Sequence, residues 1–236
     1  MRRFVSFGAG ALVLGLLATP IASAQQSVNF YVGAFTLRGE DSRDRNDVLL
    51  NNLNFLAFNI RDFNGPTFGG EWLIGFGNNF EGSLGIGLST RTVPTVYLNF
   101  VNTNGAEIEQ DLRLRVIPFT ATVRFLPLGR GYGIEPYIGA GVGVFNYRYT
   151  ESGQFLATDR TIFRDTFVGS GAATGPVILG GVRVPIGSLA LGGEIRYQSA
   201  KGDLPLDQDF AGSTATSPAK IDLGGFNYLF TVNVRF

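Results

Sequence analysis

The sequence contains no histidine and no cysteine among its 236 residues. Without histidine there is no Ser-His-Asp triad and no His-ligated metal. Without cysteine there are no disulfides and no thiol nucleophiles. A pair of carboxylates, Glu71 and Glu194, is the acid–base arrangement that stays open. We therefore predict no catalytic residue, no metal site and no cofactor, and we expect that the protein is not an enzyme.

Neither sign of charge is in excess, since 19 basic residues balance 19 acidic ones. Nucleic-acid-binding proteins carry a basic surface, so no nucleic-acid partner is predicted. After residue 24 no apolar run reaches the roughly 18 residues that a membrane-spanning helix needs. The 21 phenylalanines and 8 tyrosines are too many for a disordered chain. This composition predicts one folded domain.

The first 24 residues have the features of a secretory signal. Arg2 and Arg3 precede an apolar run from Phe7 to Leu17, and residues 22–24 (Ala-Ser-Ala) form a small-residue cleavage site. Such a run is too short for a membrane anchor. We predict that a signal peptide, residues 1–24, directs export and is cleaved, and that residues 25–236 form a single β-barrel domain.

Alternation with a period of two dominates the rest of the chain. In residues 189–198 (LALGGEIRYQ), one face carries apolar residues and glycine, whereas the other includes Glu194 and Arg196. Residues 83–91, 137–145 and 178–186 alternate in the same way. The apolar face of these segments carries no charge. This pattern is typical of β-strands with unlike faces, one of which could meet hydrocarbon.

Eight such strands can be placed along the chain. We predict them at about residues 27–38, 67–77, 82–93, 112–126, 134–149, 175–186, 189–199 and 221–236. The connections alternate between long ones (39–66, 94–111, 150–174, 200–220) and short ones. Outer-membrane barrels combine short periplasmic turns with long extracellular loops in this way. The predicted fold is all-β: an eight-stranded antiparallel up-and-down transmembrane β-barrel in the outer membrane of a Gram-negative-type bacterium.

Charged residues fall on the face of the strands that would line the lumen of this barrel. We predict that they form a network of paired side chains there: Glu71, Arg91, Arg124, Arg183, Glu194, Arg196 and Arg235. An eight-stranded barrel has an interior that side chains just fill. The network is therefore expected to plug the lumen, with the glycines of the same face leaving it room.

The last strand, "NYLFTVNVRF" (227–236), resembles the C-terminal signal by which bacterial outer-membrane barrels are recognised for assembly. The residues that carry this likeness alternate along one face: Tyr228, Phe230, Val232, Val234 and Phe236. The resemblance implies two partners, the barrel-assembly machinery during insertion and the outer-membrane lipid afterwards.

Other segments resemble small outer-membrane barrels of the OmpW and OmpA-like superfamily. "IPFTATVRFLP" (117–127) and "EPYIGAGVGVFNYRY" (135–149) are similar to a strand–turn–strand unit of these proteins. The OmpW likeness implies that a break in strand pairing lets a small hydrophobic compound leave sideways into lipid. Pro118 lacks a backbone donor and is the candidate for such a break. A β-bulge at this position is the alternative interpretation.

The long segment 39–66 carries a cluster of apolar residues: Leu49, Leu50, Leu53, Phe55 and Leu56. The resemblance does not account for this cluster. The apolar cluster itself favours a short amphipathic helix that rests on the rim of the barrel.

Three functions remain open from the sequence. The first is a barrel with a largely plugged polar lumen that acts as a structural or surface-interaction protein through its long loops. The second is OmpW-like binding or passage of small hydrophobic compounds, which an apolar funnel under the loops would favour. The third is a soluble carrier of lipocalin type, which would need its apolar face turned inward.

Overall fold

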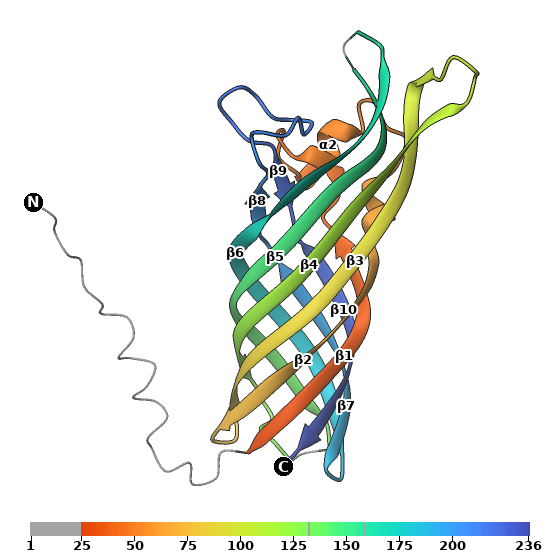
Figure 1. Cartoon of the computed structure of the whole chain (residues 1–236). Coiled ribbons are helices and arrows are strands. Elements are labelled where there is room, and N and C mark those ends of the chain that lie inside the picture. The colour runs from red at the N-terminus through yellow and green to blue at the C-terminus, as the bar shows by residue number, and fades with distance from the viewer. Residues whose placement is uncertain (1–24, 132, 158) are drawn as a thin grey trace, which may run out of the picture.

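A closed ring of eight antiparallel strands forms the body of the protein (Figure 1). The computed structural model describes residues 25–131, 133–157 and 159–236, so the predicted signal peptide lies outside the described residues. The barrel strands are β1 (Gln26–Leu37), β2 (Gly65–Phe76), β3 (Phe80–Val101), β4 (Glu107–Phe125), β5 (Glu135–Leu156), β6 (Ile162–Ile186), β7 (Leu189–Gln198) and β10 (Gly225–Arg235). Consecutive barrel strands pair, and β1 pairs with β10 to close the ring. The predicted eight-stranded antiparallel up-and-down barrel is confirmed.

The alternating residues of the barrel strands face the outside and the inside of the barrel in turn. Large apolar side chains on the outer face are exposed, among them Phe30 (56%), Ile138 (65%) and Val142 (65%). Their neighbours along the strands point inward and are buried, including charged residues such as Arg124 and Glu71. The apolar face is therefore outside and the charged face inside, the reverse of a soluble barrel.

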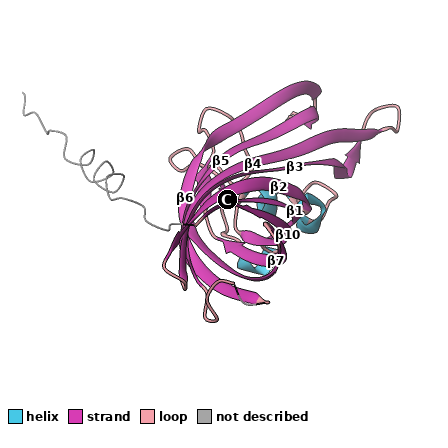
Figure 2. Ribbon diagram, turned by 90° about the horizontal axis from the view of Figure 1, so that it is seen from below, coloured by secondary structure: helices cyan, strands magenta, loops and turns pink. Residues whose placement is uncertain are grey.

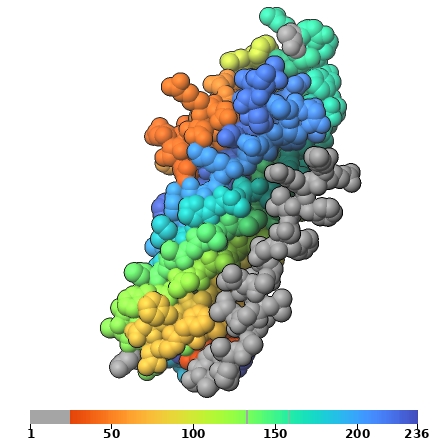
Figure 3. Space-filling model, turned by 90° about the vertical axis from the view of Figure 1, so that its left-hand side faces the viewer, coloured from red at the N-terminus to blue at the C-terminus, as the bar shows by residue number. Residues whose placement is uncertain are grey.

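The two ends of the barrel differ. At one end, the turn end, β2–β3, β4–β5 and β6–β7 are joined by short turns, and Figure 2 looks into the ring from this side. In the turn after Ile186, Gly187 has φ +64°, a left-handed conformation that glycine adopts without strain. At the other end, the loop end, the long segments 38–64 and 199–224 gather side by side (Figure 3).

Two of the four predicted long loops are wrong. Residues 94–111 and 150–174 are mostly strand, because β3–β4 and β5–β6 continue as hairpins whose turns span only residues 102–106 and 157–161. The ladder continues because the alternation continues, with Ile108, Leu112 and Leu114 buried on one face of β4. Both hairpins rise beyond the rest of the barrel at the loop end (Figure 1).

Segments 38–64 and 199–224, here called the cover, fold over the loop end. They contain the 3₁₀ helices η2 (Glu40–Ser42) and η3 (Ile60–Phe63), the helix α2 (Val48–Asn52), and the short strands β8 (Lys201–Asp203) and β9 (Lys220–Asp222). The predicted helix in 39–66 is thus present. Asp47 caps α2 by accepting from the Leu50 N–H at 3.1 Å, and its other oxygen accepts from the Asp222 N–H at 2.8 Å. None of the helices in the described residues is long and apolar enough to cross a membrane.

The cover is held by an apolar core shared with the upper strands. Val48 and Leu49 of α2 are completely buried there, together with Phe145 of β5 and Phe210 of the second cover segment. Burying a side chain of this size contributes about 1.5–3 kcal/mol. The cover therefore packs into the mouth of the barrel and does not merely rest on its rim.

Close strand packing at Gly141 leads to a stability prediction. A Cβ at this position would lie 2.0 Å from the backbone oxygen of Ala121, which cannot move away without disturbing the β4–β5 ladder. We expect Gly141→Ala to lower the free energy of unfolding by about 1–3 kcal/mol, measured by urea unfolding of the detergent-folded barrel. Gly180→Ala is the matched control, since the nearest atom to its Cβ would be 3.8 Å away. Equal stability of the two variants would contradict the packing described here.

Candidate functional site

Four charged side chains from three strands meet near the middle of the lumen. Glu71 comes from β2, Arg124 from β4, and Glu194 and Arg196 from β7. The neighbours of each along its strand face outward. Because successive side chains of a β-strand point to opposite faces, all four point inward. Gly85 opposite Glu71 leaves them space, because a Cβ there would lie 2.9 Å from the Glu71 Cγ. We call these four residues the central cluster.

In the central cluster each arginine bridges both carboxylates. Arg124 Nη2 donates to Glu71 Oε2 at 2.6 Å and to Glu194 Oε2 at 3.0 Å. Arg196 Nη2 donates to Glu71 Oε1 at 2.7 Å and to Glu194 Oε1 at 2.6 Å. All four side chains are buried, with at most 4% of any residue exposed. Two positive and two negative groups thus neutralise each other in a setting where an unpaired charge would cost several kcal/mol.

Neutral side chains complete the central cluster. Asn29 Nδ2 donates to Glu71 at 3.1 Å, and the Tyr137 hydroxyl donates to Glu194 at 3.1 Å. The guanidinium of Arg124 lies over the Tyr137 ring at 5.0 Å, and that of Arg196 lies over the Tyr31 ring at 5.2 Å. These rings fill the space beside the guanidinium groups and attract them through cation–π interactions.

A second cluster lies nearer the turn end and joins two more of the predicted residues. Arg183 donates to both oxygens of Glu81, and its Nε donates to Glu135 Oε2 at 2.7 Å. Arg235 donates to the same oxygen of Glu135. Arg130, from the β4–β5 turn, lies 3.2 Å from Glu81. These five side chains therefore form a second cluster, separate from the central cluster.

Arg91 was predicted to join this lumen network, and that prediction is wrong. Its side chain is exposed, and its Nε donates to the backbone oxygen of Asp62 at 3.0 Å. The position does face inward along β3, but at the level of the cover, where η3 offers a carbonyl in place of a carboxylate.

Sequence reasoning missed Glu81, Glu135, Arg130 and Tyr137. Glu81 was assigned to the β2–β3 turn, although β3 begins at Phe80 and puts Glu81 on the same face as Ser83 and Gly85. A signal was present: five arginines were placed in the lumen with only two glutamates. A buried network of that composition needs further carboxylates nearby.

Four residues of the predicted C-terminal signal face outward on β10, and the fifth, Phe236, follows directly after the strand. Tyr228, Phe230 and Phe236 are 50%, 53% and 71% exposed, whereas Val232 and Val234 are partly exposed. The outer face of the strand thus carries aromatic side chains in its first half and valines in its second half.

Pro118 coincides with an interruption in the β3–β4 ladder. Pairing reaches Ile86 with Phe119 and resumes at Ser89 with Val116, leaving out Ile117 and Pro118. The register is unchanged across this interruption, so the sheet has no β-bulge here. Proline has no N–H to donate to a neighbouring strand.

An aromatic cleft of about 640 Å³ lies at the loop end, between α2 and the two long hairpins. Its aromatic lining consists of Phe55, Tyr97, Phe100, Phe155, Phe163 and Phe167. The polar residues Asn52, Gln110 and Glu151 also contribute to its wall. An apolar cavity with a few polar groups is the usual form of a small-molecule site.

Glu151 is a buried carboxyl beside this cleft. Its Oε1 accepts from Asn52 Nδ2 at 2.7 Å and from the Tyr149 hydroxyl at 2.9 Å. Burial raises the pKa of Glu151 above its ordinary value of 4.5, and the two hydrogen bonds offset only part of this effect. Among the described residues, no cation lies within 4 Å of this carboxylate.

No protein-family model and no curated protein sequence matches the chain. Several solved structures of small outer-membrane barrels are similar to it. They include OprG, an outer membrane protein from Pseudomonas aeruginosa (11% identity, TM-score 0.48, covering 91% of this chain and 96% of that one). Ail, the attachment invasion locus protein of Yersinia pestis, has 10% identity and a TM-score of 0.44, covering 91% and 99%. Neisserial surface protein A has 12% identity and a TM-score of 0.44, covering 91% and 98%. The fold itself rests on the strand pairing described above.

The central cluster leads to a second stability prediction. Arg124→Met removes the cation between Glu71 and Glu194 and leaves both carboxylates with one arginine to share. We expect a loss of about 3–5 kcal/mol in the free energy of unfolding, because a buried charge loses its partner. Arg91→Met is the control, and we expect a change within about 0.5 kcal/mol because that side chain is exposed. Urea unfolding measures both, and similar losses at both positions would contradict the assignment.

A third prediction concerns pH and the cover. In the folded protein Glu151 holds its proton more tightly than in the unfolded chain, so folding takes up a proton between pH 4.5 and the raised pKa. Stability must then fall as the pH rises through that window. We expect hydrogen exchange in residues 46–56 to become faster, relative to Glu151→Gln at the same pH, as the pH is raised. The glutamine side chain of this variant keeps the oxygen that accepts both hydrogen bonds and has no charge to bury. A constant ratio between the two proteins across the pH range would show that Glu151 does not control docking of the cover.

Proposed function

We propose that the protein is an outer-membrane β-barrel with a closed polar lumen, and that it acts at the cell surface through its loop end. The membrane assignment is supported by the outer face, where exposed apolar side chains such as Phe68 and Ile178 surround the barrel. Lipid allows only spanning structures whose backbone groups are all paired internally, and a closed barrel meets this condition. A soluble carrier would need the opposite arrangement, with apolar side chains inside.

The main observation that supports a closed lumen is the burial of the central cluster. Arg124 and Glu71 are 1% and 2% exposed, although both face the axis of the barrel. Above them the core beneath the cover fills the mouth. Eight strands leave an interior just wide enough for such filling. This supports a structural or surface-interaction role over transport through the lumen, and no catalytic role is proposed.

We further propose how the protein reaches the membrane. Residues 1–24 would direct export. The outward-facing residues of β10 from Tyr228 to Val234, together with the terminal Phe236, would be recognised by the barrel-assembly machinery during insertion. The exposure of the aromatic side chains on β10 supports this, because they are available to a partner along the outer face of the final strand.

Binding of a small hydrophobic compound is the second candidate. The aromatic cleft supports it, and so does the interruption at Pro118, where a compound could reach the lipid without crossing the central cluster. In this arrangement the compound would enter from the loop end and leave between β3 and β4.

Solute passage tests the closed lumen. We expect vesicles containing the wild-type barrel to retain a small polar solute. The pair Arg196→Ala with Glu194→Ala removes one cation and one anion from the centre and should speed release at least several-fold, because space opens while the remaining Arg124 and Glu71 still balance. Lys201→Ala with Asp44→Ala is the control, since it removes an exposed ion pair of 2.7 Å in the cover.

Gel mobility of unboiled samples shows that each variant is folded before release is compared. Rapid release of the polar solute by the wild type would overturn the closed lumen. Transfer of a small hydrophobic probe by the same wild-type vesicles, without release of the polar solute, would favour the second candidate.

A further inference from the structure

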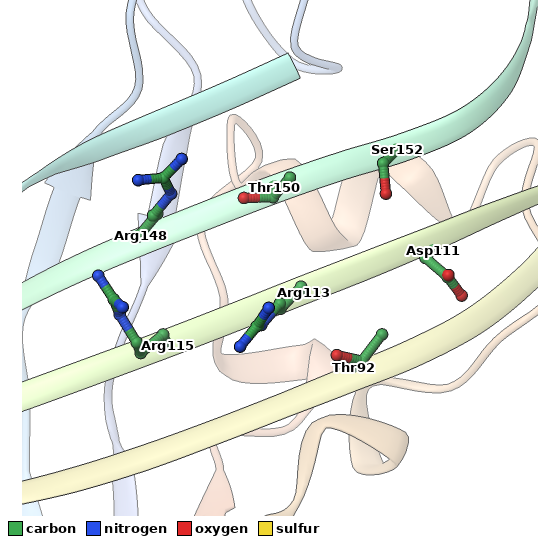
Figure 4. Close-up of a pocket in the computed structure, with 7 residues that line it drawn as sticks. All are labelled: Thr92, Asp111, Arg113, Arg115, Arg148, Thr150 and Ser152. Atoms are coloured by element: carbon green, nitrogen blue, oxygen red, sulfur yellow. The ribbon is translucent and has the colours of Figure 1, made fainter. Parts of the chain in front are cut away.

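Three arginines gather on the outside of the barrel, just above its apolar surface. Arg113 and Arg115 project from β4 and Arg148 from β5, and all three are exposed (Figure 4). With Thr92, Asp111, Thr150 and Ser152 they line a shallow groove of about 520 Å³ across β3, β4 and β5. We call this the arginine groove.

The arginine groove marks the edge of the apolar surface. Along β4 the outward positions run from Val123 through Phe119 to Arg115 and Arg113. On β5 they run from Val142 and Val144 through Asn146 to Arg148. In a membrane-spanning barrel this level corresponds to the change from lipid chains to lipid headgroups.

Like charges face each other in the groove. Arg115 and Arg148 are direct partners across the β4–β5 ladder. Like charges in this position repel and destabilise a sheet. Among the described residues no carboxylate lies within 4 Å of the three guanidinium groups, although Asp111 lines the outer edge of the groove. Their donors are therefore available to an outside anion.

The charge is confined to one side of the barrel. On β3 and β6, which lie on either side of the β4–β5 pair, the outward residues at the same level are uncharged: Thr90 pairs with Arg115 and Ser170 pairs with Arg148. Farther along β4 the outward residues become acidic, at Asp111, Glu109 and Glu107. An anion is thus attracted at the level of the arginines and repelled beyond them, which selects for a group at the membrane surface.

We propose that the arginine groove binds the phosphate of a lipid headgroup in the outer leaflet. Guanidinium groups bind phosphate oxygens through paired, charge-assisted hydrogen bonds, and the nearby hydroxyls of Thr92, Thr150 and Ser152 add further donors. The lipid chains would lie on Phe119, Val144 and Ile86 directly below, where a soluble anion has nothing to contact. This inference rests on the proposed membrane position of the barrel.

Native mass spectrometry of the detergent-folded protein tests the proposal, with phosphorylated lipid A as the probe. We expect Arg115→Gln with Arg148→Gln to weaken lipid binding by about tenfold or more, since two charge-assisted contacts are lost. Arg45→Gln with Arg61→Gln is the control, because it removes two exposed cover arginines and should bind like the wild type. Lipid A without its phosphates should bind the wild type as weakly as phosphorylated lipid A binds the double variant.

Equal binding of phosphorylated lipid A by the wild type and the groove variant would overturn the proposal. Complete competition by inorganic phosphate at similar concentrations would also overturn it, by showing a site for free anions. The heat-dependent gel mobility of the same samples reports on the barrel separately. If heating does not change the gel mobility and the protein stays in solution without detergent, the membrane assignment fails. If the mobility changes on heating and the protein needs detergent, but lipid A does not bind, only the groove assignment fails.

Discussion

Closure of the sheet between β1 and β10 is the constraint on which the rest of the structure depends. The pairing runs without a register shift from Ser27 with Arg235 to Leu37 with Gly225. Because the ring has no free edge, every barrel strand is paired on both sides, which is the condition for spanning lipid. Closure with only eight strands also fixes a narrow interior. Any side chain that points inward must then find its partner within that space.

The charged interior follows from this narrowness. Arginine and glutamate are long enough to meet across the barrel axis, as Arg124 does with Glu71 over 2.6 Å. Glycine on the neighbouring strands lets them fit: a Cβ at Gly139, the partner of Arg124 in the β4–β5 ladder, would lie 3.1 Å from the Arg124 Cγ. Buried ion pairs add little net stability compared with apolar packing, but breaking one is costly. Partial disruption of the network is therefore unfavourable, which supports the proposed closed lumen.

Period-two alternation, an apolar face without charges and a count of eight strands were together enough to predict the fold, because a sheet with an apolar outer face must close when it lies in lipid. The ends of the strands were harder to predict than the fold. Residues 107–111 lie in polar, acidic sequence, yet their backbone continues the ladder, so the predicted loop was wrong. Placing Glu81 in a turn concealed a member of the second cluster.

The position of Arg91 was also wrong. The alternation shows that Arg91 faces inward, but it does not show at which height along the barrel axis the side chain lies or which partner it meets there. The core beneath the cover joins Val48 to Phe145 and Phe210, residues too far apart in sequence for local patterns to relate them.

The two sides of the loop end are built differently, which bears on where a partner could bind. Segments 38–64 and 199–224 fold inward, and their apolar residues pack into the core. The β3–β4 and β5–β6 hairpins instead extend outward (Figure 1), and near their tips Leu98, Phe100 and Phe163 remain 51%, 42% and 40% exposed. Leu98 and Phe100 lie beyond the arginine groove on β3, and Phe163 lies on the neighbouring strand β6. Lipid contacts at the base of the hairpins would therefore fix the direction in which the tips project. The hairpin side is therefore where the proposed surface interaction has both the reach and the apolar area that binding requires.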